Sequence, residues 1–116
     1  MNSKRSYFPH IIEKHPHADI CIEGLKSRLV QAGKQQLVFM EFESNVEIPS
    51  HKHNAQWDVG LKEEMEQTVN GETKDLKKGE NGFIEKGVVH SAGILAGCKD
   101  VTLFDQADRN GQMQKI

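Results

Sequence analysis

The sequence predicts an all-β fold, a sandwich or barrel of about eight to eleven short strands. From Leu25 onward, apolar and polar residues alternate, whereas helical periodicity is weak. Gly, Pro, Asn and Asp interrupt this alternation at short intervals, as expected of turns between strands. Asn70-Gly71 is the strongest turn signal, because a type I′ hairpin needs positive φ at both central residues. Together these features favour an all-β class.

The elements follow from this punctuation in chain order. In the second strand, Val38, Met40 and Phe42 share one face at period two, and Leu37 and Phe39 share the other. The stretch 16–25 fits either a turn or a short strand. The third strand contains Pro49, which suits an edge strand or a strand start. The predicted strands cover residues 25–31, 35–43, 46–53, 56–61, 64–69, 72–76, 82–85, 90–95 and 99–104.

Length and charge indicate the domain organisation and limit the possible partners. A chain of 116 residues fits one domain, 1–116. Within it we expect a barrel over about 25–105, an irregular or strand-swapped N-terminal segment 1–24, and a polar tail 106–116. The net charge is −2 with no basic block, so we expect no nucleic-acid partner.

Membrane and compartment signals are weak. The longest apolar run, Leu37–Met40, is far below the roughly 20 residues of a membrane span, so no membrane partner is expected. Residues 1–14 lack the apolar core of a secretory signal. Cys21 and Cys98 form no CxxC pair. We therefore expect reduced thiols and a cytoplasmic location.

Histidine spacing points to a metal site. His51 and His53 flank Lys52, and on a strand they project from one face about 6–7 Å apart, close enough to share an ion. His90 opens a distant strand and offers a third imidazole. Gln56 joins only if Asn54-Ala55 turns the chain.

A second histidine pair carries less weight. His15 and His17 flank Pro16, which breaks a strand ladder, and no third ligand follows them.

Two stretches resemble the motifs of the cupin family. Residues 49–57, continued through Glu64 to the Asn70-Gly71-Glu72 hairpin, resemble the first motif, and residues 79–90 resemble the second. The resemblance spans over a third of the chain and implies a double-stranded β-helix, or jelly-roll, cupin barrel. Four positions depart from the usual pattern: Gln56 replaces an acidic ligand, Glu63 a Gly, Glu85 a Pro, and Asp58 a commonly small residue.

The resemblance also implies a cofactor. Carried over by position, the ligands are His51, His53, Gln56 and His90, holding one divalent transition metal per chain (Zn, Fe, Ni, Mn or Cu). These neutral ligands leave the charge of the ion uncompensated, so we expect modest affinity and chemistry by Lewis acidity or redox. Alternatively, Gln56 orients a neighbouring His without binding the ion.

Two further polar residues fall on inward-facing positions. Asp58 shares the parity of Gln56 and is the candidate catalytic residue, as a general base or as an anchor for a ligating His. The alternative is a carboxylate at the solvated mouth of the barrel. Gln67 either lines the cavity floor or bonds a strand edge. Apolar lining or core is expected at Met40, Phe42, Met65 and Phe83.

These features favour a metal-dependent enzyme acting on a small oxygenated molecule, with dioxygenase- or isomerase-type chemistry. The alternative is a non-catalytic small-molecule or metal-binding sensor module using the same cavity. A purely structural metal fits least, because structural sites normally have closed shells. A homodimer is expected, because Leu37, Phe39 and Trp57 place apolar groups on faces turned away from the core.

Overall fold

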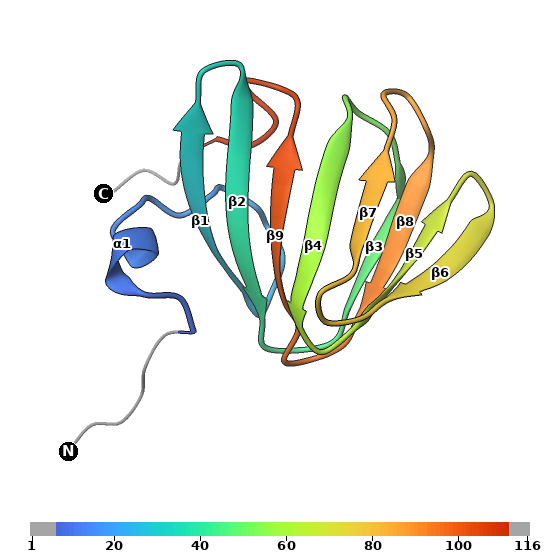
Figure 1. Cartoon of the computed structure of the whole chain (residues 1–116), viewed down its shortest axis with the longest axis horizontal. Helices are drawn as coiled ribbons and strands as arrows, with labels where there is room; N and C mark the ends of the chain where they lie inside the picture. The colour runs from blue at the N-terminus through green and yellow to red at the C-terminus, as the bar shows by residue number, and fades with distance from the viewer. Residues whose placement is uncertain (1–6, 112–116) are drawn as a thin grey trace.

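In the computed structural model, which describes residues 7–111, nine strands form two antiparallel sheets (Figure 1). One sheet has the order β1-β2-β9-β4-β7 and the other β3-β8-β5-β6. The strands are β1 (Leu25–Ala32), β2 (Gln35–Phe42), β3 (Val46–His51), β4 (Gln56–Lys62), β5 (Met65–Val69), β6 (Glu72–Leu76), β7 (Asn81–Ile84), β8 (His90–Ile94) and β9 (Lys99–Phe104). Expectations for residues 1–6 and 112–116 lie outside the described residues.

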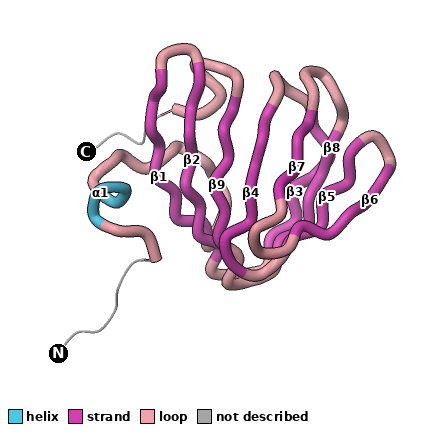
Figure 2. The backbone as a smooth tube through the Cα atoms, viewed as in Figure 1, coloured by secondary structure: helices cyan, strands magenta, loops and turns pink. Residues whose placement is uncertain are grey.

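The all-β prediction is confirmed, and the strands fall close to the expected ranges. Figure 2 shows strand over most of the chain from β1 to β9. The largest difference is β3, which ends at His51 instead of residue 53. Its pairing with β8 shifts between Ile48 and His51, on either side of Pro49. Because proline cannot donate to a ladder, an irregularity is expected at this position.

One core cluster lies between the two sheets, and a second packs the five-stranded sheet against Ala18 of the N-terminal segment. Both follow the period-two pattern. Val38 and Phe42 of β2 are fully buried on the inner face, as their spacing predicts. Phe83 is a correction, because it is 61% exposed and was expected to line the core. Its neighbours Gly82 and Ile84 are buried, so the parity of β7 turns Phe83 outward.

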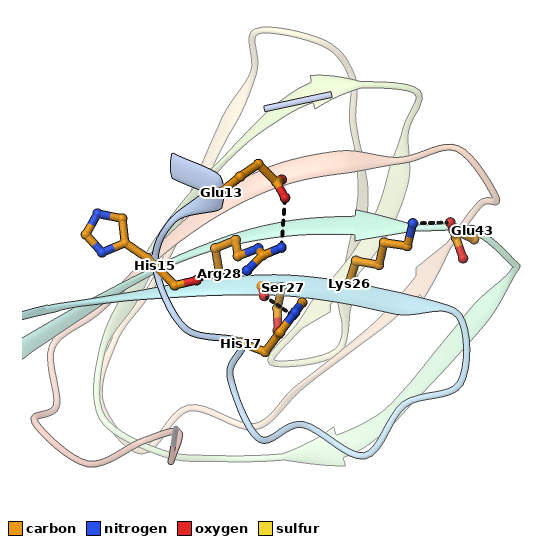
Figure 3. Close-up of polar contacts among 7 residues, drawn as sticks. All are labelled: Glu13, His15, His17, Lys26, Ser27, Arg28 and Glu43. Carbon is orange, nitrogen blue, oxygen red and sulfur yellow. Dashed lines mark hydrogen bonds and ion pairs between the residues drawn. The ribbon is translucent and has the colours of Figure 1, made fainter. Parts of the chain in front are cut away.

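The N-terminal segment lies along β1. It contains α1 (His10–Glu13), a single turn after Pro9 that is too short to leave a helical pattern in the sequence. Glu13 accepts a 2.8 Å bond from Arg28, which also donates to the carbonyl of His15 (Figure 3). His17 donates to the carbonyl of Ser27 at 3.0 Å. These bonds hold the segment against β1.

Among residues 7–111 no helix has the length and apolar character needed to cross a bilayer.

Candidate metal centre and its cavity

A cavity of about 440 Å³ lies between the sheets. Its walls come from both sheets, from residues 19–22 of the N-terminal segment, and from Arg109 and Asn110 after β9. This volume is in the range of small-molecule sites, about 300–1,000 Å³. The space between the sheets is therefore large enough for a small metabolite.

Three histidines converge on this cavity. His51 of β3 lies opposite His90 of β8 in the sheet register. His53 follows two residues after β3 ends, and its carbonyl accepts a bond from the Gly87 amide at 2.9 Å. The ring centroids are 4.2 Å apart for His51 and His90, and 4.8 Å for His53 and His90. One donor atom from each ring lies within 4.8 Å of the other two, an arrangement that can hold a metal ion.

Backbone contacts set the orientation of each ring. The Nδ1 atoms of His51, His53 and His90 donate to nearby carbonyls at 2.8, 2.6 and 2.9 Å. In a neutral ring, a proton on Nδ1 leaves the Nε2 lone pair free. This tautomer can bind a metal ion through Nε2. The Nε2 atoms of His53 and His90 are buried and have no hydrogen-bond partner among the described residues. The donor set therefore fits a divalent transition metal.

Burial keeps the His53 and His90 rings neutral. Burial lowers the pKa of His53 to about 4, and the nearby Arg109 and His90 charges add to this. Burial likewise lowers the pKa of His90. Neutral imidazole is the metal-binding form, so these two rings are ready to coordinate at neutral pH.

The fourth sequence-predicted ligand lies in the same cavity. Gln56 opens β4 and lines the wall shared with the three histidines. The chain does leave its extended course at Asn54-Ala55, between β3 and β4, as the prediction required.

Asp58 also lines the cavity and is only 3% exposed, which excludes a fully solvated position at the mouth. Its Oδ2 accepts a 2.6 Å bond from Gln67, whereas Oδ1 has no partner among the described residues. Burial raises the pKa of Asp58 to about 6, although the Gln67 bond opposes this rise. Gln67 thus faces the cavity and bonds a carboxylate instead of a strand edge.

The sequence reasoning missed Asp100 on β9. This residue is fully buried, and burial raises the pKa of its carboxyl well above the usual value, with the Asp58 charge adding to the rise. Asp100, Thr102 and Phe104 alternate along the inner face of β9. The sequence gives no clear signal here, because the more apolar parity of β9, with Val101 and Leu103, is the outward one.

Arg109 was missed as well. It follows β9 in a stretch expected to be a polar tail, yet its side chain lines the cavity. Spacing gives no hint of this, because the position depends on contacts of an irregular segment. His15 and His17 lie outside the histidine cluster, as their weak pattern suggested.

Comparisons with known proteins bear on the fold. No family model matches the chain, and no curated protein matches its sequence. Solved structures do match. An RmlC-like cupin from Shewanella frigidimarina is 21% identical, with a TM-score of 0.72 over 90% of this chain and 94% of that one. KdgF from Halomonas sp. is 18% identical, with a TM-score of 0.72 over 91% and 96%.

An oxalate decarboxylase from Bacillus subtilis is 19% identical, with a TM-score of 0.70 over 86% of this chain but 31% of that longer one. The two antiparallel sheets form a jelly roll, and these likenesses show that it is a cupin fold. The fold implied by the two sequence motifs is therefore confirmed.

Proposed function

We propose that this chain is a metal-binding cupin that holds one divalent transition metal at His51, His53 and His90. Gln56 is the fourth or weaker ligand, and water completes the coordination. The observation that carries this proposal is the pair of buried, unpartnered Nε2 atoms within a group of three convergent imidazoles. The similar Bacillus subtilis protein has Mn(II) centres, which supports a metal in this fold.

The proposed ligand is a small oxygenated metabolite in the cavity. A bound divalent ion supplies Lewis acidity or redox chemistry to such a molecule. Asp58 is the proposed catalytic residue, because one of its oxygens has no hydrogen-bond partner within residues 7–111 and lies in the same cavity. Its contribution is to take up or return a proton, as isomerase-type chemistry requires.

The metal proposal is tested by elemental analysis of protein purified without chelators. Wild type is expected to bind one ion per chain, and the double variant His51→Ala/His53→Ala to bind none while remaining folded. His15→Ala/His17→Ala is the matched control, because it removes a second HxH pair outside the cluster. Retention of stoichiometric metal by the double cluster variant would show that the site is wrongly assigned.

Gln56→Glu separates the two roles of Gln56. If Gln56 is a ligand, the added negative charge tightens metal binding. An unchanged affinity shows that the amide acts only by orienting a histidine.

The enzyme proposal competes with a non-catalytic binding or sensor module. Both readings predict that metal-loaded protein binds a small molecule, measured as a thermal shift in a screen of carboxylates, phenols and sugars. Only the enzyme proposal predicts turnover that Asp58→Asn removes while metal and ligand binding persist. Binding without turnover in wild type favours the sensor module.

We also propose a homodimer formed through the outer face of the five-stranded sheet. Trp57 is 40% exposed there, and it lies between Phe83 and Leu103 in the register of the neighbouring strands. Exposed aromatic groups of this kind favour association through a two-fold axis. Sedimentation is expected to give a dimer at micromolar concentration and a monomer for Trp57→Lys. A monomeric wild type contradicts this proposal.

The proposed location is the cytoplasm. This proposal is supported by Cys21 and Cys98, which are both free thiols, as is usual in a reducing compartment. Burial raises the pKa of Cys98 to about 12, which leaves this thiol unreactive.

A further inference from the structure

Arg109 reaches the cavity from a segment that is fixed in place. The buried amide of Gln36 on β2 donates to the carbonyls of Ala107 and Asn110 at 3.1 and 2.8 Å. Its oxygen accepts the Asn110 amide at 2.8 Å. The carbonyl of Gly111 accepts a 2.7 Å bond from the Asp19 amide. Arg109 lies between these anchors, so its backbone is held at the cavity wall.

The Arg109 guanidinium has no acidic partner within residues 7–111. The two ion pairs found there are Lys26–Glu43 and Arg28–Glu13. The acids nearest to Arg109 in sequence are engaged elsewhere, since Asp108 accepts from Gln106 and Asp105 from Gln35. The Arg109 Nε is buried with no hydrogen-bond partner among these residues. Asp19, Asp58 and Asp100 also line the cavity, but none of these acids forms an ion pair with the half-buried Arg109 cation.

The cation lies at the histidine end of the cavity. The Phe104 ring is its common neighbour: the Arg109 Cζ lies 5.7 Å from the ring centroid, and the His53 ring centroid also lies 5.7 Å away. Along β9, Phe104 pairs with Gln56, whereas Asp100 pairs with Gly60. Asp100 and Phe104 are four residue steps apart along the strand, or roughly 13 Å. Asp100 is thus distant from the arginine.

The charged groups around the cavity indicate what kind of ligand it binds. The three imidazoles are uncharged ligands, so a divalent ion among them and Arg109 together leave a positive field at this end of the cavity. A guanidinium matches a carboxylate with two parallel hydrogen bonds. The acids on the same wall, Asp19, Asp58 and Asp100, disfavour a highly charged anion, which suits a carboxylate better than a doubly charged phosphate ester. Much of the remaining wall is apolar, as at Ile22, Met40 and Met65.

We propose that Arg109 is the anion-binding residue of the cavity and that the ligand is a small carboxylate. Its carboxylate pairs with Arg109, and a second oxygen-bearing group points to the three histidines. The second contact depends on the proposed metal site, whereas the Arg109 contact depends only on the cavity.

The test compares short 2-hydroxy acids with their neutral amides on the full chain. Calorimetric titrations use glycolate, lactate and 2-hydroxybutyrate, each against the amide that lacks the carboxylate, with zinc-loaded and with metal-free protein. Zinc-loaded wild type is expected to bind at least one hydroxy acid about tenfold or more tightly than its amide, the usual contribution of one charge-assisted pair. Arg109→Gln is expected to lose this preference and keep its zinc.

Two further variants keep the result interpretable. Arg109→Lys keeps the charge without the planar fork, and is expected to retain part of the preference even if Arg109→Gln folds poorly. Lys34→Gln removes an exposed charge in the turn between β1 and β2, and is expected to behave as wild type.

The outcomes separate this inference from the metal proposal. An undiminished preference for the acid over its amide in both Arg109 variants, or no preference in wild type, overturns the role of Arg109. If wild type binds no zinc but metal-free protein binds a hydroxy acid in an Arg109-dependent way, the metal proposal fails and the anion site stands.

Discussion

Gln67 of β5 donates a 2.6 Å hydrogen bond to Asp58 of β4, and this bond joins the four-stranded sheet to the five-stranded sheet inside the cavity. Gly82 of β7 makes room for the pair. A Cβ at this position would lie 2.7 Å from Gln67 Oε1 and 3.2 Å from Asp58 Oδ1. The polar interior of the barrel therefore depends on a glycine that sequence motifs do not mark.

Removal of the Gln67 donor is expected to destabilise the fold. Gln67→Leu leaves the buried Asp58 carboxylate without its hydrogen bond, at a cost of about 1–3 kcal/mol. The loss grows from pH 5 to pH 8, because the pKa of Asp58 is about 6 and the bond is strongest to the ionised form. Urea unfolding at both pH values measures this, and an equal loss at both would contradict the charge-assisted bond.

Asp100 is expected to limit stability at neutral pH. Its folded-state pKa is raised well above 3.8, so the folded protein binds more protons than the unfolded chain above that pH. Stability therefore falls as pH rises from about 4. Asp100→Asn removes this dependence and should stabilise the protein at pH 7 but not at pH 3.5. Exposed Asp105→Asn is the control, and a destabilised Asp100→Asn at pH 7 would refute the account.

The His53 ring should titrate at unusually low pH. From an ordinary value of 6.5, burial lowers its pKa to about 4 in the folded chain. The unfolded chain therefore binds the proton first, and folding stability contributed by neutral His53 declines between about pH 6.5 and 4. NMR titration of metal-free protein measures the ring directly. A midpoint at or above 6.5 would show that the ring is not desolvated.

Glu63 occupies a strained backbone position. It has a φ of 58°, in the left-handed region, at the position where cupins carry a Gly. A side chain in this region costs about 1–2 kcal/mol, partly offset by the greater unfolded-state freedom of glycine. Glu63→Gly should therefore raise stability by about 0.5–1 kcal/mol. Glu64→Gly, at a residue without positive φ, should lower it, and the reverse order would contradict the argument.

The sequence predicts much of this fold because its signals are local. Alternation at period two and the Asn70-Gly71 turn locate the strands, and HxH spacing locates His51 and His53. His90 requires the family resemblance, because only the β3–β8 pairing brings it opposite His51.

The remainder of the site depends on contacts distant in sequence. Arg109 reaches the cavity only because Gln36 fixes the segment after β9. Asp100 takes its raised pKa from burial, to which Asp58 on a neighbouring strand adds. Phe83 was wrongly assigned to the interior because four residues of β7 give too short a pattern to fix which face is buried.

The central claim is a single metal ion held by His51, His53 and His90. Crystals of the full chain grown with zinc, with data collected on both sides of the zinc absorption edge, test it most directly. The account predicts one anomalous peak per chain, about 2.0–2.1 Å from the Nε2 atom of each of the three rings. A peak elsewhere, or none at this site in zinc-saturated crystals, would contradict it.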